Sequence, residues 1–199
     1  MDTSCRAAFI LAGGKSTRMG SDKAFVMLDG RTLLDRALGL ARAITPDVRI
    51  VGDGEKFGQY ATVVGDIFPN CGPLAGIHTA LRASRAELNL ILAVDLPFLT
   101  PAFLQFMISQ AEKAPKALVT LAHAAGGWQP LCAVYRGGFA DAAEQALQAG
   151  RYKIDRLFPE IEIQKISDEE LGSAGFPLTI FRNLNTPQDL TNAVQSADT

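Results

Sequence analysis

The sequence predicts an α/β protein with a Rossmann-like, doubly wound and mostly parallel sheet flanked by helices. Strand and helix signals alternate over the first 120 residues, which is typical of this class. The segment 88–94 is apolar at nearly every position, as expected for a parallel strand that is covered on both faces. Glycine or aspartate follows several expected strands, and ligands of such sheets bind beyond the carboxyl ends of the strands.

Composition limits both the size and the class of the protein. The chain has 199 residues, of which 48% are hydrophobic, enough for one domain with a large core. The formal net charge of −2 argues against a general nucleic-acid binder, which would usually be basic. Apolar runs are shorter than a membrane span, and we expect no membrane contact. Cys5, Cys71 and Cys132 form no C-x-x-C pair, which fits reduced thiols and a cytoplasmic location.

Each element of the first half has a local signal. Expected strands cover 7–11, 48–51, 60–64 and 88–94. An apolar helical face begins after Thr32 and is ended by Pro46. Gly72-Pro73 and Thr100-Pro101 each place proline at the first position of a helix, so two further helices are predicted there.

The second half is less regular. Strands are expected at 117–121 and 130–135, separated by a loop at 126–128. Apolar spacing predicts a helix around 139–147. A short helix at 151–158, a strand at 160–166 and a last helix from Thr186-Pro187 complete the expected order.

The loop after the first expected strand has the composition of a phosphate site. Gly13, Gly14 and Gly20 end the strand and allow backbone amides to approach a ligand closely. Three cations fall within nine residues of this loop, and amides with cations suit a polyphosphate: Lys15, Arg18 and Lys23. The spacing is neither that of a P-loop nor that of the dinucleotide fingerprint. The structural alternative is a solvated glycine loop.

Two aspartates follow expected strands and should meet the glycine loop at one edge of the sheet. Asp95 ends the apolar run 88–94, where a rigid strand would position its carboxylate. Mg²⁺ commonly takes one or two carboxylates together with substrate phosphates, so Asp95 is the expected metal ligand. Asp66 ends the segment 60–64. Both could instead be turn residues, Asp95 as a cap before Pro97.

Several segments resemble one family. The stretch 11–24, Leu-Ala-Gly-Gly-x-Ser-x-Arg-Met-Gly-x-Asp-Lys-Ala, resembles the signature loop of molybdenum cofactor guanylyltransferases. Gly-Pro-Leu-Ala-Gly at 72–76, Gln-Pro-Leu at 129–131 and Asn-x-Asn-Thr-Pro-x-Asp-Leu at 183–190 match the same family in the same order. Members attach GMP from GTP to molybdopterin and release pyrophosphate.

The resemblance implies a role for each matching residue. It implies three catalytic residues: Arg18, Lys23 and Asp95. It implies a GTP site made by Leu11, Ala12, Gly13, Gly14, Lys23, Asp66, Gly72, Pro73, Leu74 and Asp95, with Mg²⁺ on Asp95. It implies a pterin site at Gln129, Asn183 and Asn185. The single domain 1–199 would then divide into a nucleotide-binding part, 1–112, and a pterin-binding part, 113–199.

The implied partners are GTP and molybdopterin as substrates. Transient contacts with molybdenum cofactor biosynthesis proteins and molybdoenzyme chaperones are also implied. Asn183 and Asn185 could alternatively hold the turn into the last helix.

Three other functions are compatible with parts of this pattern. Family members often carry an asparagine after the second strand, whereas this chain has Gly52-Asp53-Gly54. A cytidylyltransferase that acts on the same pterin is therefore the nearest alternative. Another nucleotidyltransferase, such as one for sugar phosphates, is more distant. A nucleotide- or pterin-binding carrier without turnover is disfavoured because Arg18, Lys23 and Asp95 are all present.

Overall fold

The fold is built on a seven-stranded sheet with the order β5-β4-β1-β6-β8-β7-β9. The computed structural model describes residues 6–13 and 22–184. The strands are β1 (Arg6–Leu11), β4 (Val48–Val51), β5 (Thr62–Val64), β6 (Leu88–Ala93), β7 (Val119–Ala124), β8 (Gly127–Tyr135) and β9 (Ile163–Ser167). Every described pairing in this sheet is parallel except the two that β8 makes, with β6 and with β7.

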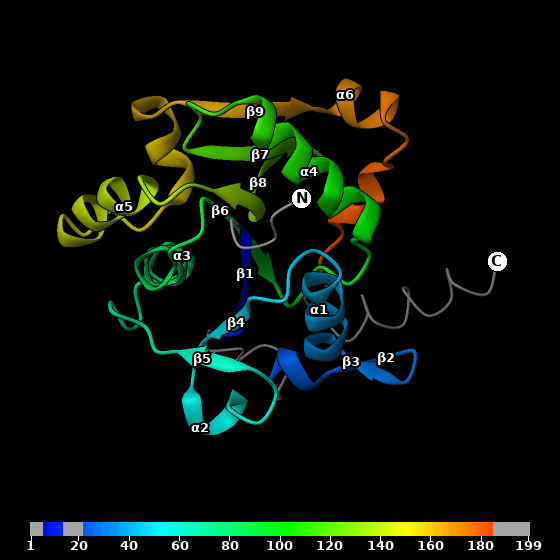
Figure 1. Cartoon of the computed structure of the whole chain (residues 1–199), viewed down its shortest axis with the longest axis vertical. Helices are drawn as coiled ribbons and strands as arrows, with labels where there is room; N and C mark the ends of the chain where they lie inside the picture. Colours follow the sequence, from blue (N-terminus) through cyan, green and yellow to red (C-terminus); the bar gives the residue numbers. More distant parts are fainter. Residues whose placement is uncertain (1–5, 14–21, 185–199) are drawn as a thin grey trace.

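Helices cover both faces of the sheet, which confirms the doubly wound α/β prediction. The α-helices are α1 (Leu33–Arg42), α2 (Gly54–Phe57), α3 (Pro73–Ala83), α4 (Pro101–Lys113), α5 (Phe139–Gln148) and α6 (Asp168–Ser173). Core side chains of α1, α4 and α6 pack together on one face. Those of α3 and α5 pack on the other, as Figure 1 shows with the sheet between them.

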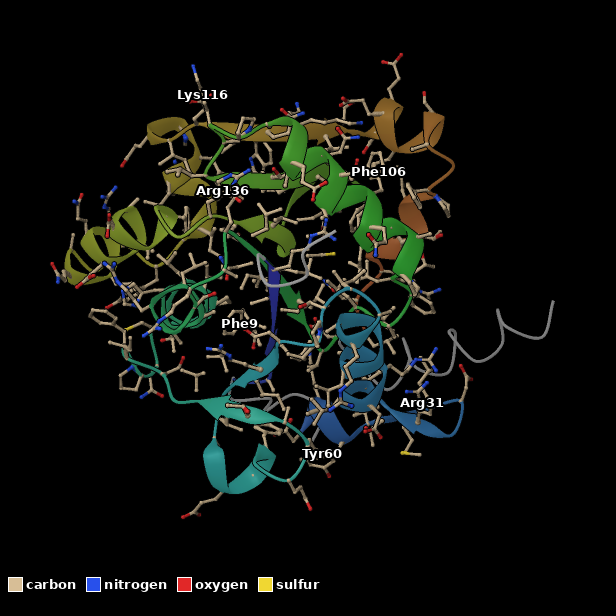
Figure 2. All side chains as sticks on the ribbon, viewed as in Figure 1. Phe9, Arg31, Tyr60, Phe106, Lys116 and Arg136 are labelled. Carbon is tan, nitrogen blue, oxygen red and sulfur yellow. The ribbon has the colours of Figure 1, made fainter. Side chains whose placement is uncertain are left out.

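The strand β1 shows why the apolar runs are uninterrupted. Ala8 and Ile10 enter the core under α1 and α4, whereas Ala7 and Phe9 enter the core under α3 and α5. In Figure 2 Phe9 lies on the α3 side of β1. Because both faces are buried, alternation of polar and apolar residues is absent from this strand.

The predicted helix starts are confirmed, and their caps explain them. Thr32 accepts a hydrogen bond from the amide of Asp35, 3.0 Å away, at the start of α1. Thr100 accepts one from the amide of Phe103 at 3.2 Å, with proline in the first turn of α4. Such caps satisfy amides that the helix itself leaves unpaired.

Short elements differ from the sequence-based expectation. Residues 52–54 end β4 and also start the short helix α2. The Asp53 side chain accepts a hydrogen bond from the amide of Glu55 at 2.9 Å and caps this helix. The expected loop 126–128 shortens to a turn at Ala125 and Gly126, with φ of 53° and 82°, so that Trp128 belongs to β8.

Short helices and a small hairpin complete the description. A reciprocal Ser167–Glu170 capping box forms α6, which was not predicted. The expected helix at 151–158 is a 3-10 helix, η3 (Ile154–Glu160). Two other 3-10 helices are η2 (Lys23–Phe25) and η4 (Leu178–Phe181), and a small hairpin joins β2 (Met27–Leu28) to β3 (Arg31–Thr32). The expected last helix from Thr186 lies outside the described residues.

Across residues 6–13 and 22–184, no helix has the length and apolar character needed to cross a membrane.

The start of α3 requires glycine, and this requirement is testable. Gly72 has φ 74° and ψ −167°, a region that side chains with a Cβ essentially do not adopt. We therefore expect Gly72→Ala to lower the free energy of unfolding by about 1–3 kcal/mol, measured by urea denaturation. Gly65→Ala is the control, since Gly65 is in the same loop, has no positive φ and leaves open space for a Cβ. Equal losses in the two variants would contradict the backbone argument.

Candidate active site

The carboxyl ends of β1, β4 and β5 converge at glycines. A Cβ added to Gly13 would lie 3.7 Å from Oδ2 of Asp66 and 4.0 Å from the carbonyl oxygen of Val51. A Cβ added to Gly52 would lie 3.2 Å from the Phe57 ring and 3.7 Å from the Gly13 nitrogen. The three strand ends therefore lie close together, and the Asp66 carboxylate lies near Gly13 at the start of the glycine loop.

The position of Asp66 changes the pKa of its carboxyl group. The residue is exposed as a whole, but its carboxyl group lies against the backbone at Gly13. The partial burial raises the pKa of the Asp66 carboxyl above its ordinary value, because burial disfavours the charged form. A hydroxyl group near this carboxylate would find a strong hydrogen-bond acceptor.

The start of α3 reaches the same edge, following β5. Pro73 occupies the first turn of α3, and no side chain caps its N-terminus. Leu74 is fully buried among the core residues of that face, so its side chain packs the helix onto the sheet. Gly76 allows α3 to approach β1 closely, since a Cβ there would lie 3.3 Å from the Leu11 side chain. Leu11 and Leu74 thus support the site by packing.

Lys23 and Asp95 form the central charge pair of the site. Asp95 follows β6, the strand next to β1 at the centre of the sheet. The Nζ atom of Lys23 lies 3.2 Å from Oδ2 of Asp95, and the two side chains are 23% and 22% exposed. Two residues that are 72 positions apart therefore meet where ligands of such sheets bind.

The helix η2 that carries Lys23 is fixed from both sides. Asp22 accepts a hydrogen bond from the amide of Ala24 at 2.9 Å and forms an ion pair with Lys56 of α2. The rings of Phe25 and Phe57 stack with centroids 5.8 Å apart. Asp22 and Lys56 were not selected from the sequence. Asp22 could have been found, because it belongs to the Asp-Lys-Ala ending of the loop motif.

The segment at 183–184 meets Asp95 from the far end of the described chain. The amide of Leu184 donates a hydrogen bond to the carbonyl oxygen of Asp95 at 3.0 Å. Asn183 therefore lies next in sequence to a residue that is tied to the expected metal ligand. The described start of the C-terminal motif, residues 183–184, is therefore tied to the end of β6.

The β7–β8 hairpin brings Gln129 to the same end of the sheet. Because β8 runs antiparallel to β6, its first residues lie at the carboxyl end of β6. The amide nitrogen Nε2 of Gln129 donates to the carbonyl oxygen of Ala124 at 3.1 Å, and the Tyr135 hydroxyl donates to that of Pro130 at 2.8 Å. The Gln129 nitrogen therefore shapes the hairpin.

The structure brings together most of the predicted residues that it describes. Near the carboxyl ends of β1, β5 and β6 lie Ala12, Gly13, Lys23, Asp66, Gly72, Pro73 and Asp95. Gly14, Lys15, Arg18 and Asn185 lie outside the described residues. Within the described part of the chain, no three His, Cys, Asp or Glu side chains are grouped as a metal cage. A magnesium site shared with substrate phosphates needs only one or two carboxylates, and Asp95 fits that requirement.

Known proteins share this sequence and this fold. Residues 8–163 match the model of the MobA-like NTP transferase domain. The molybdenum cofactor guanylyltransferase of Desulfosudis oleivorans is 35% identical over 187 residues, covering 92% of each chain. A probable molybdenum cofactor guanylyltransferase of Pelotomaculum thermopropionicum is 34% identical over 92% of this chain and 89% of that protein.

Among solved structures, molybdopterin-guanine dinucleotide biosynthesis protein A from Archaeoglobus fulgidus superimposes with a TM-score of 0.83. It has 28% identity over 96% of this chain and 98% of its own. The agreement in sequence, fold and motif order leads to one conclusion: the chain belongs to the MobA-like NTP transferase family and is a nucleotidyltransferase.

Proposed function

We propose that this enzyme transfers GMP from GTP to molybdenum-loaded molybdopterin, forming the guanine dinucleotide cofactor and releasing pyrophosphate. The observation that carries the proposal is the position of the Lys23–Asp95 pair. The pair lies between the end of the glycine loop and the segment that contains Asn183. In the reaction, an oxygen of the pterin phosphate forms a bond to the α-phosphorus of GTP. The bond from that phosphorus to the pyrophosphate oxygen breaks.

The donor side is the edge formed by β1, β4, β5 and α3. Backbone amides after Gly13 and the side chains of Arg18 and Lys23 would bind the phosphates, since guanidinium and ammonium groups complement their charge. Asp66 would accept hydrogen bonds from the nucleoside. Gly72 and Pro73 begin α3, in which Gly76 packs against Leu11 at the end of β1. Catalysis in this arrangement is positioning together with charge neutralisation.

Mg²⁺ is the cofactor that Asp95 would hold. The donor is a carboxylate oxygen at the end of a rigid strand, which is the ligand type this ion prefers. When bound, the ion supplies charge neutralisation to the triphosphate and to the departing pyrophosphate. Lys23 would share Asp95 with the ion, because the Lys23 ammonium group lies 3.2 Å from the Asp95 carboxylate.

The acceptor side is assigned to residues 113–199. Gln129 lies at the start of β8, and Asn183 is next to the residue that bonds Asp95. Amide side chains both donate and accept, which suits the edge of a pterin ring, and Asn185 would act with them. This assignment divides the site between donor residues in 1–112 and acceptor residues in 113–199.

Transfer of CMP is the second candidate function, because this chain lacks the asparagine that members of the resembling family often carry after the second strand. No asparagine occurs at 52–54, and Asp53 there uses its carboxylate to cap α2. Base selection therefore depends on other groups.

Pyrophosphate release tests the function. We expect release with GTP only when molybdopterin is present, and much less with ATP, CTP or UTP. The Asp95→Asn variant should lose at least 100-fold in turnover, because removal of one preorganised charged group costs about 2.7–4 kcal/mol. Its circular dichroism should match the wild type. CTP as the preferred donor would replace the guanylyl assignment by the cytidylyl one.

The Lys23–Asp95 pair makes a prediction about metal affinity without nucleotide. Lys23→Ala should let the nucleotide-free protein bind Mn²⁺, a Mg²⁺ substitute, about 1.5–5-fold more tightly, since a part-exposed ion pair contributes about 0.2–1 kcal/mol. The same variant should bind GTP more weakly, because a phosphate-facing cation is lost. Lys116→Ala is the control, since Lys116 is exposed and lies before β7, at the opposite end of the sheet from Asp95. Weaker metal binding by Lys23→Ala, measured by calorimetry, would contradict the competition.

The division between donor and acceptor sides can be tested at Asn183. Asn183→Ala should weaken pterin binding about 2–10-fold, the range expected for loss of one hydrogen bond, and leave the GTP affinity nearly unchanged. Calorimetric titration with each ligand measures both. The Asn185→Ala variant should behave in the same way. If both ligands lose affinity equally, the asparagines only support the C-terminal segment.

A further inference from the structure

A small satellite core is formed by side chains from segments that flank the charge pair in sequence. It consists of buried Leu28, Leu33 and Leu184, which are 2%, 1% and 0% exposed, packed with Val26 and Phe98. We call this group the anchor cluster. Its members come from the hairpin after η2, the start of α1, the segment after β6 and the segment after η4.

The segments that carry Lys23, Asp95 and Asn183 each contribute a side chain to the anchor cluster. Val26 caps η2, the helix that begins at Lys23. Phe98 follows Asp95 in the turn after β6. Leu184 itself follows Asn183. The anchor cluster therefore packs together the segments that carry Lys23, Asp95 and Asn183.

Asp95 is held at two places. Its carboxylate is paired with Lys23 at 3.2 Å, and its carbonyl oxygen accepts the amide of Leu184 at 3.0 Å. A single hydrogen bond fixes neither the direction nor the depth of the segment that makes it. The fully buried side chain of Leu184 supplies this constraint, because a shorter side chain would leave an unfilled volume among Leu28, Leu33 and Phe98.

We propose that Leu184 is a positioning residue for the acceptor substrate: it holds Asn183 beside Asp95 through the anchor cluster. This role rests on the proposed transfer of GMP to a pterin. Leu184 touches no reacting atom and acts through Asn183 and the main chain of Asp95.

The donor side does not depend on the anchor cluster to the same degree. Gly13, Asp66 and the start of α3 lie at β1, β5 and the core of the opposite face. Lys23 has further support from the Asp22 cap on η2 and from the Phe25–Phe57 stack. Loss of the Leu184 side chain should therefore affect the acceptor more than GTP.

The test compares Leu184→Ala with a matched variant of the same segment. Ile180 in η4 is also buried, at 5% exposure, but it belongs to the main core under α1 and α4. Leu184→Ala, Leu184→Met and Ile180→Ala are compared with wild type. The measurements are kcat and KM for GMP transfer, the GTP and molybdopterin affinities by calorimetry, and urea unfolding.

We expect Leu184→Ala to lose at least 10-fold in kcat/KM for molybdopterin and in its affinity, with GTP affinity within twofold of wild type. Leu184→Met, which keeps most of the side-chain volume, should recover most of the loss. Ile180→Ala should lower the urea concentration at the unfolding midpoint about as much as Leu184→Ala does. Its kcat/KM for molybdopterin should stay within twofold of the wild-type value.

Two outcomes would overturn the role of Leu184 and leave the proposed function standing. In the first, the wild-type enzyme is active and Leu184→Ala has the same kcat/KM for molybdopterin. In the second, Leu184→Ala and Ile180→Ala lose equal amounts of kcat/KM for molybdopterin. An inert wild-type protein would overturn the proposed function and this role together. The molybdopterin titration separates these cases, because it needs no turnover.

Discussion

The site depends on one ion pair, between Lys23 at the end of the glycine loop and Asp95 at the end of β6. Both side chains are about one-fifth exposed, and such pairs contribute at most about 1 kcal/mol to stability. Its importance is therefore positional. The pair holds the Lys23 ammonium group, the proposed phosphate-binding cation, 3.2 Å from the Asp95 carboxylate, the proposed metal ligand.

The sheet order explains how this pair can exist. The neighbouring strands β1 and β6 are parallel, with Arg6 opposite Leu88 and Leu11 opposite Ala93. The loop after β1 and Asp95 after β6 therefore begin at the same edge of the sheet. The connections run to opposite sides of these strands, with β4 beside β1 and β8 beside β6. A crevice at such a switch point is where ligands bind in α/β sheets. Among the described strands of this sheet, β8 runs antiparallel to both of its neighbours, and it brings Gln129 to the proposed acceptor side.

The sequence was sufficient where a local cause determines the structure. Continuous apolar runs predicted β1 and β6, and Gly72-Pro73 predicted α3, because burial and backbone preference act within a few residues. The strand-end positions of Asp66 and Asp95 followed from the same reasoning. Contacts such as Asp22–Lys56 and Leu184–Asp95 could not be predicted, because they depend on tertiary packing between segments that are distant in sequence. The sequence predicted a loop at Trp128. In the structure the turn is only two residues long, at Ala125 and Gly126, and Trp128 already belongs to β8.

Two packing groups support the proposed donor and acceptor sides to different degrees, and this difference has a physical consequence. Gly13, Asp66 and α3 are held by the sheet and by the core shared with α5, whereas Leu184 is held by the anchor cluster. Because packed groups transmit strain mainly to atoms they touch, a change in one group need not displace the other. Asp95 belongs to both sides, through its carboxylate and through its carbonyl oxygen. A change in the anchor cluster would therefore reach the proposed phosphate-binding groups mainly through Asp95 and through Val26 at the end of η2.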